Sequence, residues 1–143
     1  MRPWFSVRAA DWERDADALR EIRIAVFCIE QDVPPELEWD GVDPQCEHAL
    51  AVDAGGAAIG CGRLLPDGHI GRMAVLREWR GRGVGGALLE HFVALARDRG
   101  HAVARLNAQV HAIPFYEAHG FAVTGDVYDD AGIPHREMSR RLR

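Results

Sequence analysis

Apolar residues recur along the chain with two different periods, and the change from one period to the other predicts the order of the elements. Alternating apolar positions predict an opening strand over 4–10, and helical spacing predicts an amphipathic helix over 12–29. The expected core face of this helix consists of Leu19, Ile22, Ala25, Val26 and Ile29. The breaker DVPPE, residues 32–36, ends the helix and opens an acidic loop.

The middle of the chain has the pattern of a hairpin that leads into a further strand and a long helix. Two apolar runs over 48–65 flank Gly55 and Gly56, which predicts two strands joined by a turn. A third strand is expected over 69–76. The apolar stripe that follows predicts a helix over 84–100, whose last residue is a glycine typical of helix C-termini.

The last third of the chain predicts a strand over 102–110, a short helix over 112–120 and two closing strands over 121–128 and 135–142. The complete order is β, α, ββ, β, α, β, α, ββ. This order is typical of a mixed α/β architecture in which helices cover a partly antiparallel sheet. A chain of 143 residues has the length of one domain, so we expect a single domain over 1–143.

A stretch rich in glycine and arginine, LREWRGRGVGGALLEHF, joins the third strand to the long helix. Its glycines are Gly81, Gly83, Gly85 and Gly86. Several glycines before a helix allow backbone N–H groups to converge on one point, where the helix dipole adds positive potential. Arg80 and Arg82 would add charge-assisted hydrogen bonds. The stretch predicts a pyrophosphate site, and the alternative is a glycine-rich turn with a solvated arginine pair.

The same letters match the dinucleotide motif GxGxxG, through Gly81, Gly83 and Gly86. A nicotinamide dinucleotide site also requires an acidic residue about 20 positions further on. The next strand instead ends in Asn107, Gln109 and His111. A P-loop requires lysine, which this chain lacks. A nicotinamide-dependent oxidoreductase therefore remains only as an alternative function.

Charge is distributed unevenly along the chain. The net charge of -5 argues against a nucleic-acid binder. Neither arginine nor lysine occurs between Arg23 and Arg63, whereas that gap holds Glu30, Asp32, Glu36, Glu38, Asp40, Asp43 and Glu47. This acidic segment favours a cationic acceptor such as a polyamine, an amino sugar or a peptide amine, and the alternative is a solvated face.

Other classes of site and location are disfavoured by composition. No apolar run approaches the roughly 20 residues that cross a bilayer, and the N-terminus has no export signal, so we expect a cytoplasmic protein without a membrane partner. The cysteines Cys28, Cys46 and Cys61 lack CxxC spacing and predict free thiols. The seven histidines lack HxxxH or HExxH spacing, so we predict no metal site.

The chain resembles the GCN5-related N-acetyltransferases (GNAT), whose acetyl-CoA pyrophosphate loop has the pattern [QR]xxGx[GA]. Arg80, Gly83 and Gly85 match that pattern. It is most similar to the ElaA-like branch of acyltransferases, through RIAVFCIEQDVP (23–34), LNAQVHAIPFYEAHGF (106–121) and VYDDAGIPHREM (127–138). One departure is Asn107, where that branch often has glycine.

The resemblance implies a mostly antiparallel sheet, splayed between the fourth and fifth strands, and acetyl transfer from acetyl-CoA to a primary amine in a ternary complex. It also implies that acetyl-CoA contacts Met73, Ala74, Val75, Arg80, Gly81, Arg82, Gly83, Val84, Gly85, Gly86, Asn107, Phe115 and Tyr116. The N–H of Val75 occupies the family's oxyanion position, and Tyr116 occupies its general-acid position. We expect a small-molecule or peptide amine as acceptor, no nucleic acid, and a monomer or homodimer.

Each catalytic or substrate-binding residue has a structural alternative. Tyr116 would protonate the CoA thiolate or would simply be a packed aromatic. His111 would relay the amine proton or cap the short helix. Glu30 would act as the base or, with Gln31, would bind the acceptor, and the alternative for both is a solvated helix end. His135 would bind the acceptor or stabilise a turn. A module that binds acyl-CoA without turnover is the alternative for the whole protein.

Overall fold

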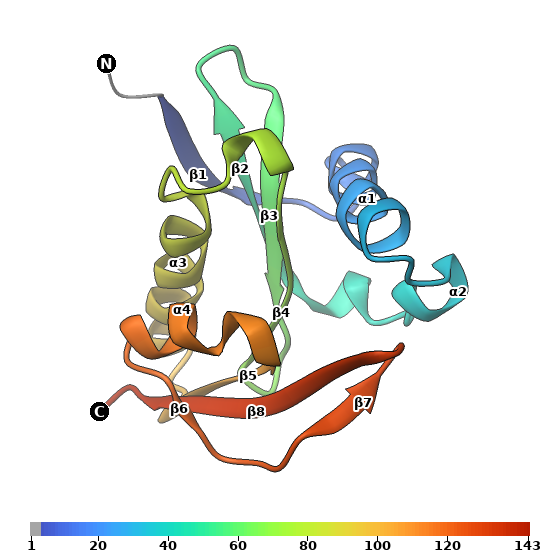
Figure 1. The fold of residues 1–143 in the computed structure, drawn as a ribbon. Coiled ribbons are helices and arrows are strands. Elements are labelled where there is room, and N and C mark those ends of the chain that lie inside the picture. The colour runs from blue at the N-terminus through green and yellow to red at the C-terminus, as the bar shows by residue number, and fades with distance from the viewer. Residues whose placement is uncertain (1–3) are drawn as a thin grey trace.

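The computed structural model describes residues 4–143 (Figure 1). Its elements follow the predicted order, except that a short helix forms over Pro35–Glu38 and that two short strands, Ala122–Val123 and Tyr128–Asp130, replace the strand expected over 121–128. The strands are β1 (Phe5–Ala10), β2 (Glu47–Asp53), β3 (Ala58–Leu64), β4 (His69–Val75), β5 (Val103–Gln109), β6 (Ala122–Val123), β7 (Tyr128–Asp130) and β8 (Ile133–Arg141). The helices are α1 (Ala16–Arg23), the π-helix η1 (Ile24–Glu30), α2 (Pro35–Glu38), α3 (Val84–Asp98) and α4 (Ile113–Ala118). Short 3₁₀ turns are η2 (Asp43–Gln45), η3 (Arg77–Trp79) and η4 (Val110–Ala112).

The strands form one sheet in the order β1-β2-β3-β4-β5-β8-β6, and β7 pairs with β8. All pairings are antiparallel except the one between β4 and β5. These two strands pair only at His69↔Arg105 and Ile70↔Leu106, and they diverge beyond that point. The prediction of a mostly antiparallel sheet that is splayed between the fourth and fifth strands is therefore confirmed.

Helices cover both faces of the sheet (Figure 1). On one face, α3 packs its buried side chains against β2, β3, β4, β5 and β8. A Cβ added to Gly62 of β3 would lie 2.6 Å from Cε2 of Phe92, so α3 approaches this strand closely only because residue 62 is glycine. On the opposite face, α1 and η1 contribute a smaller cluster, which consists of Leu19, Ile22, Val26, Leu50, Cys61 and Ala74.

The first helical segment is not a continuous α-helix. After Arg23 it continues as a π-helix, which ends with the N–H of Gln31 donating to the carbonyl of Val26 at 3.1 Å. Each π-type turn takes up one more residue than an α-turn, so the apolar stripe rotates away from the sheet. Ile29 is 72% exposed as a result. The prediction that Ile29 belongs to the core is therefore wrong.

The C-terminal hairpin also differs from the expected one. β8 begins at Ile133, inside the segment 129–134 that was expected to be the turn. Ala131 and Gly132 have φ angles of 54° and 80° and form the two-residue turn between β7 and β8. β8 pairs with β5 from Gln109 to Val103, and this long pairing places the start of β8, at His135, beside the end of β5 where the splay is open.

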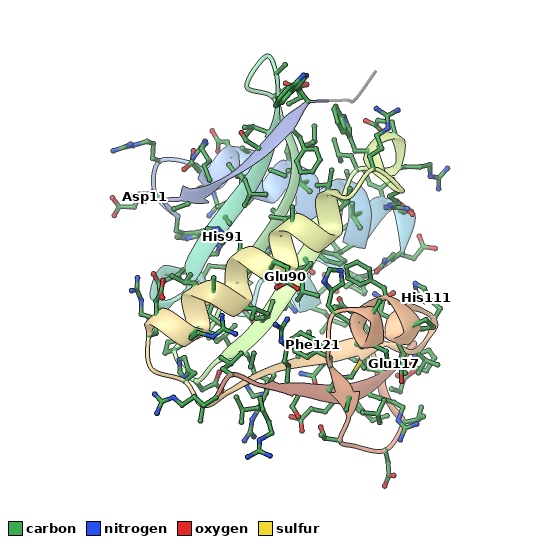
Figure 2. All side chains as sticks on the ribbon, turned by 90° about the vertical axis from the view of Figure 1, so that its left-hand side faces the viewer. Asp11, Glu90, His91, His111, Glu117 and Phe121 are labelled. Carbon is green, nitrogen blue, oxygen red and sulfur yellow. The ribbon has the colours of Figure 1, made fainter. Side chains whose placement is uncertain are left out.

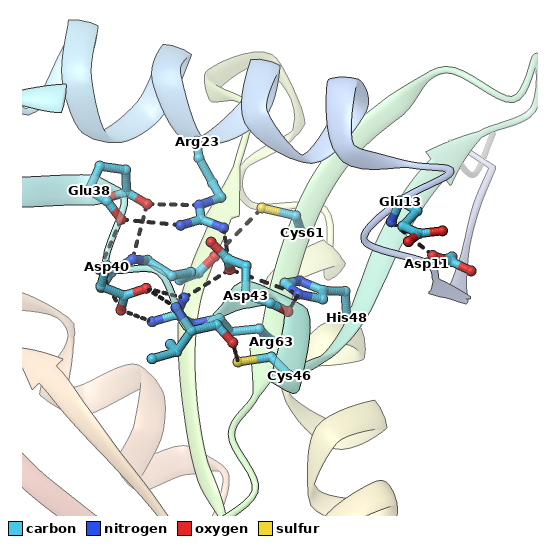
Figure 3. A network of polar contacts seen from close by, with 12 residues as sticks. Asp11, Glu13, Arg23, Glu38, Asp40, Asp43, Cys46, His48, Cys61 and Arg63 are labelled. Atoms are coloured by element: carbon cyan, nitrogen blue, oxygen red, sulfur yellow. Dashed lines mark hydrogen bonds and ion pairs between the residues drawn. The ribbon is translucent and has the colours of Figure 1, made fainter. Parts of the chain in front are cut away.

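A network of ion pairs joins the acidic segment to three arginines from α1, β3 and β4 (Figure 3). Its pairs are Arg23–Glu38, Arg23–Asp43, Arg63–Asp40, Arg63–Asp43, Arg72–Glu38 and Arg72–Asp40. Arg23 and Asp43 are buried and their charged atoms lie 2.8 Å apart. The network thus fixes the loop between η1 and β2 onto the sheet.

The structure corrects the expectation of a negative field over the acidic segment. Glu38, Asp40 and Asp43 are neutralised by the network, Glu47 pairs with Arg99, and Glu30 pairs with Arg80. Within residues 4–143, only Asp32 and Glu36 of this segment have no ion pair. Most of these carboxylates are therefore paired with arginines of the fold, and the cationic acceptor stays a prediction.

We expect Asp43→Asn to lower the free energy of unfolding at neutral pH by about 3 kcal/mol, because it leaves two buried guanidinium groups without their shared carboxylate. Burial alone raises the pKa of Asp43, but hydrogen bonds from Arg23 and Arg63 outweigh that effect and lower it. A carboxyl with a lowered pKa stabilises the fold above its unfolded pKa and loses that contribution as the pH falls. The difference between variant and wild type should therefore shrink below about pH 4.

Urea denaturation at neutral and acidic pH measures this difference. Asp126→Asn is the matched control, since Asp126 is exposed and its substitution should change the free energy of unfolding by less than about 0.5 kcal/mol. Equal stability of the two variants would contradict a structural role for the network.

The structure also describes the state of the three cysteines. Cys28, Cys46 and Cys61 are free thiols, and burial raises the pKa of Cys61 to about 12. In the described part of the chain, no helix has the length and apolar character needed to cross a membrane. The same residues contain no group of three or more side chains arranged to hold a metal ion.

Candidate active site

A β-bulge in β4 marks the point at which this strand leaves β5. Cys61 faces Ala74, whereas Arg63 faces Gly71, so β4 has one more residue than β3 over this interval. Arg72 lies within the interval and has a φ of 48°, a left-handed conformation that is uncommon for residues with a side chain. Ion pairs with the buried network hold its guanidinium group in place. The network therefore stabilises the bulge from which the splay begins.

Beyond the bulge, the backbone of Val75 faces the open side of the splay. The N–H of Leu76 donates to the carbonyl of Ile59 at 2.9 Å, so the neighbouring pair Val75–Gly60 is a non-hydrogen-bonded pair of the antiparallel ladder. The N–H and C=O of Val75 therefore point away from β3. Arg80 Nε donates to the carbonyl of Val75 at 3.0 Å. The N–H of Val75 is directed toward the splay, where β5 is not paired with β4.

The glycine loop before α3 presents unpaired backbone donors. Gly81 and Gly83 have φ angles of 76° and 88°, and a Cβ at either position would meet no atom within 4 Å, so the backbone conformation is what requires glycine. The first backbone bond of α3 runs from the N–H of Ala87 to the carbonyl of Gly83 at 3.0 Å. The N–H groups of 84–86 therefore have no acceptor within the helix, and no side chain caps them. This arrangement suits an anion.

Arg80 is held in position by a carboxylate from η1. Its Nη1 and Nη2 donate to the two carboxylate oxygens of Glu30 at 2.6 and 2.7 Å. Hydrogen bonding from Arg80 lowers the pKa of Glu30. Arg82 is exposed, and its guanidinium carbon lies 4.9 Å from the ring centroid of Trp79. Both arginines of the loop thus have defined partners, and Glu30 lies beside the loop as an ionised, paired carboxylate.

The end of η1 bridges the two limbs of the splay. Glu30 contacts Arg80, which follows β4, and the next residue, Gln31, accepts a hydrogen bond at 2.9 Å from Nε2 of Gln109, the last residue of β5. The side chains of Glu30 and Gln31 therefore bind residues on opposite sides of the splay. Their position at the end of a π-helix agrees with the frequent occurrence of π-bulges at functional sites.

α4 places two aromatic residues beside the glycine loop. The rings of Phe115 and Tyr116 are 5.0 Å apart and nearly perpendicular. A Cβ added to Gly85 would lie 3.5 Å from Cζ of Phe115 and 3.9 Å from Cγ2 of Val75, so α4, the loop and β4 meet at this point. Burial raises the pKa of Tyr116 to about 12. Its phenol is therefore protonated at neutral pH.

Polar contacts hold the six-residue helix α4 against α3 and β8. His119, the residue that follows α4, has its Nδ1 2.8 Å from a carboxylate oxygen of Glu90 on α3. Arg140 of β8 donates both to that carboxylate and to the carbonyl of His119. Figure 2 shows Glu90 on the side of α3 that faces α4. The position of Tyr116 is thus set by contacts with two other elements.

A cleft of about 440 Å³ opens beside the splay. Of the residues predicted for the site, those that line the cleft are Gln31, Met73, Asn107, Tyr116 and His135. Arg72 and Gln109 line it as well. Glu30 and His111 are not part of the lining. His111 is exposed in the turn η4, before α4, and lies at the edge of the molecule in Figure 2, so the structure does not bring it to the cleft.

Comparison with known families identifies this arrangement. The family model described as an acetyltransferase (GNAT) domain matches residues 17–142. The chain belongs to the GNAT family. It is 39% identical over 123 residues to the uncharacterized N-acetyltransferase YjcF of Bacillus subtilis. The alignment covers 83% of this chain and 87% of YjcF. The prediction of GNAT membership from the loop motif is confirmed.

Solved structures of the GNAT type agree with the fold. Escherichia coli ElaA superposes on this chain with a TM-score of 0.84 and 27% sequence identity. The superposition covers 96% of this chain and 100% of the ElaA chain. An acyl-CoA N-acyltransferase from Pseudomonas aeruginosa has a TM-score of 0.84 and 29% identity, covering 96% of this chain and 99% of that one. The similarity to the ElaA-like branch is therefore supported by structure as well as by motifs.

GNAT membership also explains the GxGxxG match. Over residues 4–143 the sheet has one parallel pairing, between β4 and β5, and this part of the chain lacks the doubly wound parallel sheet of dinucleotide-binding folds. The glycines of the loop belong instead to the GNAT pattern before α3. This fold does not support the alternative of a nicotinamide-dependent oxidoreductase.

Two features of the GNAT site were missed by sequence reasoning. The first is Arg72, which occupies the bulge of β4 and pairs with Glu38 and Asp40. Gln109 was considered only as a strand end, although it connects β5 to η1. No local pattern identifies either role, because both partners are distant in sequence. Ala74 is buried against α1 and its backbone faces Cys61 of β3, so the structure does not turn it toward the splay.

Proposed function

We propose that this GNAT protein transfers the acetyl group of acetyl-CoA to a primary amine by direct attack within a ternary complex. The observation that carries the proposal is the N–H of Val75, which points into the splay beside the uncapped amides of the glycine loop and the protonated Tyr116. These are the donors that acyl transfer from a thioester requires. The curated relative YjcF is named as an N-acetyltransferase, which agrees with this function.

The proposed binding of acetyl-CoA uses the two limbs of the splay. The diphosphate would lie on the amides between Arg80 and Gly86, where two left-handed glycines allow close approach. The pantetheine arm would pair with the free backbone edge of β4 at Met73 and Val75, in place of the missing partner strand. Asn107 and Phe115 would contact the arm from β5 and α4.

The proposed chemistry assigns one step to each donor. The neutral amine attacks the thioester carbonyl, forming the C–N bond, and the N–H of Val75 stabilises the oxyanion. When the tetrahedral intermediate collapses, the C–S bond breaks and Tyr116 donates a proton to the leaving thiolate. A pKa of about 12 keeps that proton on Tyr116 at neutral pH, which favours an acid over a base.

The acceptor would enter through the cleft of about 440 Å³ beside the splay, and acetyl-CoA would occupy the glycine loop and the edge of β4. Its walls combine apolar side chains such as Phe27 and Leu37 with the amides of Gln31 and Asn107. The charged groups at its base are the paired members of the ion-pair network. We propose a primary amine on a small molecule or peptide, held by apolar and amide contacts near Gln31 and His135.

The proposed function is tested by ligand stabilisation followed by turnover. Acetyl-CoA should raise the melting temperature and NADH should not, and longer acyl-CoAs show the acyl preference. CoA release is then measured with benzylamine, spermidine, glucosamine and a lysine-containing tripeptide. Amine-dependent release supports transfer. Stabilisation without release from any amine would favour the non-catalytic binding module, and stabilisation by NADH alone would contradict the proposal.

A further inference from the structure

The proposed reaction needs a group that removes the proton of the acceptor ammonium, whose pKa is about 10.4 for a lysine-like amine. Glu30 and His111, the two residues that the sequence suggested for this role, are not suitable proton acceptors. Glu30 is bound through both carboxylate oxygens to Arg80, and that contact lowers its pKa. His111 is exposed and does not line the cleft. The proton acceptor must therefore be sought among the groups that do line it.

The cleft contains seven titratable side chains, which are Glu38, Arg63, His69, Arg72, Tyr116, Asp130 and His135. The arginines and the protonated Tyr116 cannot accept a proton at neutral pH. Glu38 is buried and is committed to two arginines. Asp130 is exposed at the outer end of β7, where water competes for it. The two histidines remain.

The two histidines differ in their free nitrogen atoms. His69 has Nδ1 3.0 Å from a carboxylate oxygen of Asp67 and Nε2 3.5 Å from one of Glu137, so both nitrogens face carboxylates. His135 has Nδ1 2.8 Å from the carbonyl oxygen of Ile133. A carbonyl only accepts hydrogen bonds, so Nδ1 carries the hydrogen and Nε2 of the neutral ring has a free lone pair.

The fold fixes the ring of His135 at the cleft. The residue faces Gln109 across the β5–β8 ladder, at the end of β5 where the splay is open. Its ring stacks on Tyr128 with centroids 5.9 Å apart and planes 28° from parallel. Nε2 has no hydrogen-bond partner in residues 4–143. The ring is therefore held in place by Ile133 and Tyr128, and Nε2 is the nitrogen that stays available.

We infer that Nε2 of His135 is the proton acceptor for the amine in the acetyl transfer proposed above, and the inference rests on that proposed function. The ammonium proton passes to Nε2, and the free amine then forms the C–N bond. The second amine proton leaves nitrogen as the C–S bond breaks and passes through solvent to the phenolate of Tyr116, which restores the proton that Tyr116 gave to the thiolate. His135 returns its proton to solvent, so each turnover releases one proton.

Several titratable side chains stand on the elements around His135 or line the same cleft. β7 contributes Tyr128, Asp129 and Asp130, the turn η4 contributes His111, and the cleft contributes Tyr116, Glu38, Arg63, His69 and Arg72. β5 presents the uncharged Gln109 directly opposite. The arginines of the cleft are paired with carboxylates, so they do not place an unbalanced positive charge beside His135.

The test compares His135→Asn with wild type in the dependence of kcat/KM on pH, using CoA release with the amines above. The asparagine amide can retain the hydrogen bond to the carbonyl of Ile133 but supplies no base. We expect a loss of about 100-fold at pH 7. The loss should diminish as the pH rises, because the amine then loses its proton without help. The Kd of acetyl-CoA, measured by calorimetry, should be unchanged.

His135→Gln is a second variant for the case in which asparagine disturbs the turn. A loss that is equal at every pH, or a rate within about threefold of wild type in both variants, would overturn the role of His135 while leaving acetyl transfer intact. A wild-type protein that binds acetyl-CoA and releases no CoA with any amine would contradict the proposed function itself, and the inference with it.

Discussion

Gly83→Val is expected to weaken acetyl-CoA binding by about 100-fold or more. Gly83 has a φ of 88° at the start of α3, and a β-branched residue cannot adopt that conformation without strain. The new side chain would also displace the backbone amides on which the diphosphate is proposed to lie. Isothermal titration calorimetry with acetyl-CoA measures the change in Kd.

Gly100→Val is the matched control for this substitution. Gly100 follows the other end of α3 with a φ of 84°, and a Cβ there would meet no atom within 4 Å, as at Gly83. Both variants should therefore lose comparable thermal stability, and only the one in the loop should lose acetyl-CoA affinity. Equal affinities in the two variants would exclude the loop as the diphosphate site.

Tyr116→Phe is expected to lower kcat for CoA release by about 100-fold, because the leaving thiolate loses its proton donor. The Kd of acetyl-CoA should change by less than about threefold, since the ring and its packing against Phe115 remain. Stopped or continuous assays of free thiol measure kcat at saturating acetyl-CoA.

Removal of the hydroxyl group should leave stability intact, which separates a catalytic loss from a folding defect. Within residues 4–143 the Tyr116 hydroxyl has no hydrogen-bond partner, so its removal leaves no group unpaired. Unchanged kcat would show that Tyr116 is a packed aromatic residue, as its structural alternative states. A parallel fall in melting temperature and kcat would also count against a specific role for its hydroxyl.

The parts of the site that the sequence predicts are those with local causes. The glycines between Arg80 and α3, the hairpin at Gly55 and Gly56 and the end of α3 at Gly100 each follow from backbone conformations that neighbouring residues define. The loop motif could therefore be assigned to a strand–helix junction before any coordinates were known, and the family resemblance added the expected splay.

The parts that the sequence could not predict depend on contacts between distant residues. The acidic segment reads as a charged surface because Arg63 and Arg72, which neutralise it, lie in strands that the segment reaches only in the folded state. The helical period cannot reveal the π-helix, although that helix exposes Ile29 and brings Glu30 to Arg80. Charge counting therefore suggested a cationic acceptor for which the paired carboxylates give no support.

The roles of the histidines also depend on contacts that the sequence does not reveal. His111 and His135 both stood in motifs of the resemblance, and spacing alone could not separate them. Their difference arises because η4 leaves His111 exposed, whereas β8 places His135 beside Gln109 at the cleft. A nitrogen with a free lone pair is a property of the folded hydrogen-bond arrangement, here the contact with Ile133.

The most direct measurement is the crystal structure of the complex with acetyl-CoA. The diphosphate should accept hydrogen bonds from main-chain N–H groups between Arg80 and Gly86, and the thioester oxygen should lie within hydrogen-bond distance of the N–H of Val75. Acetyl-CoA bound in another place, with the loop before α3 empty, would contradict the account.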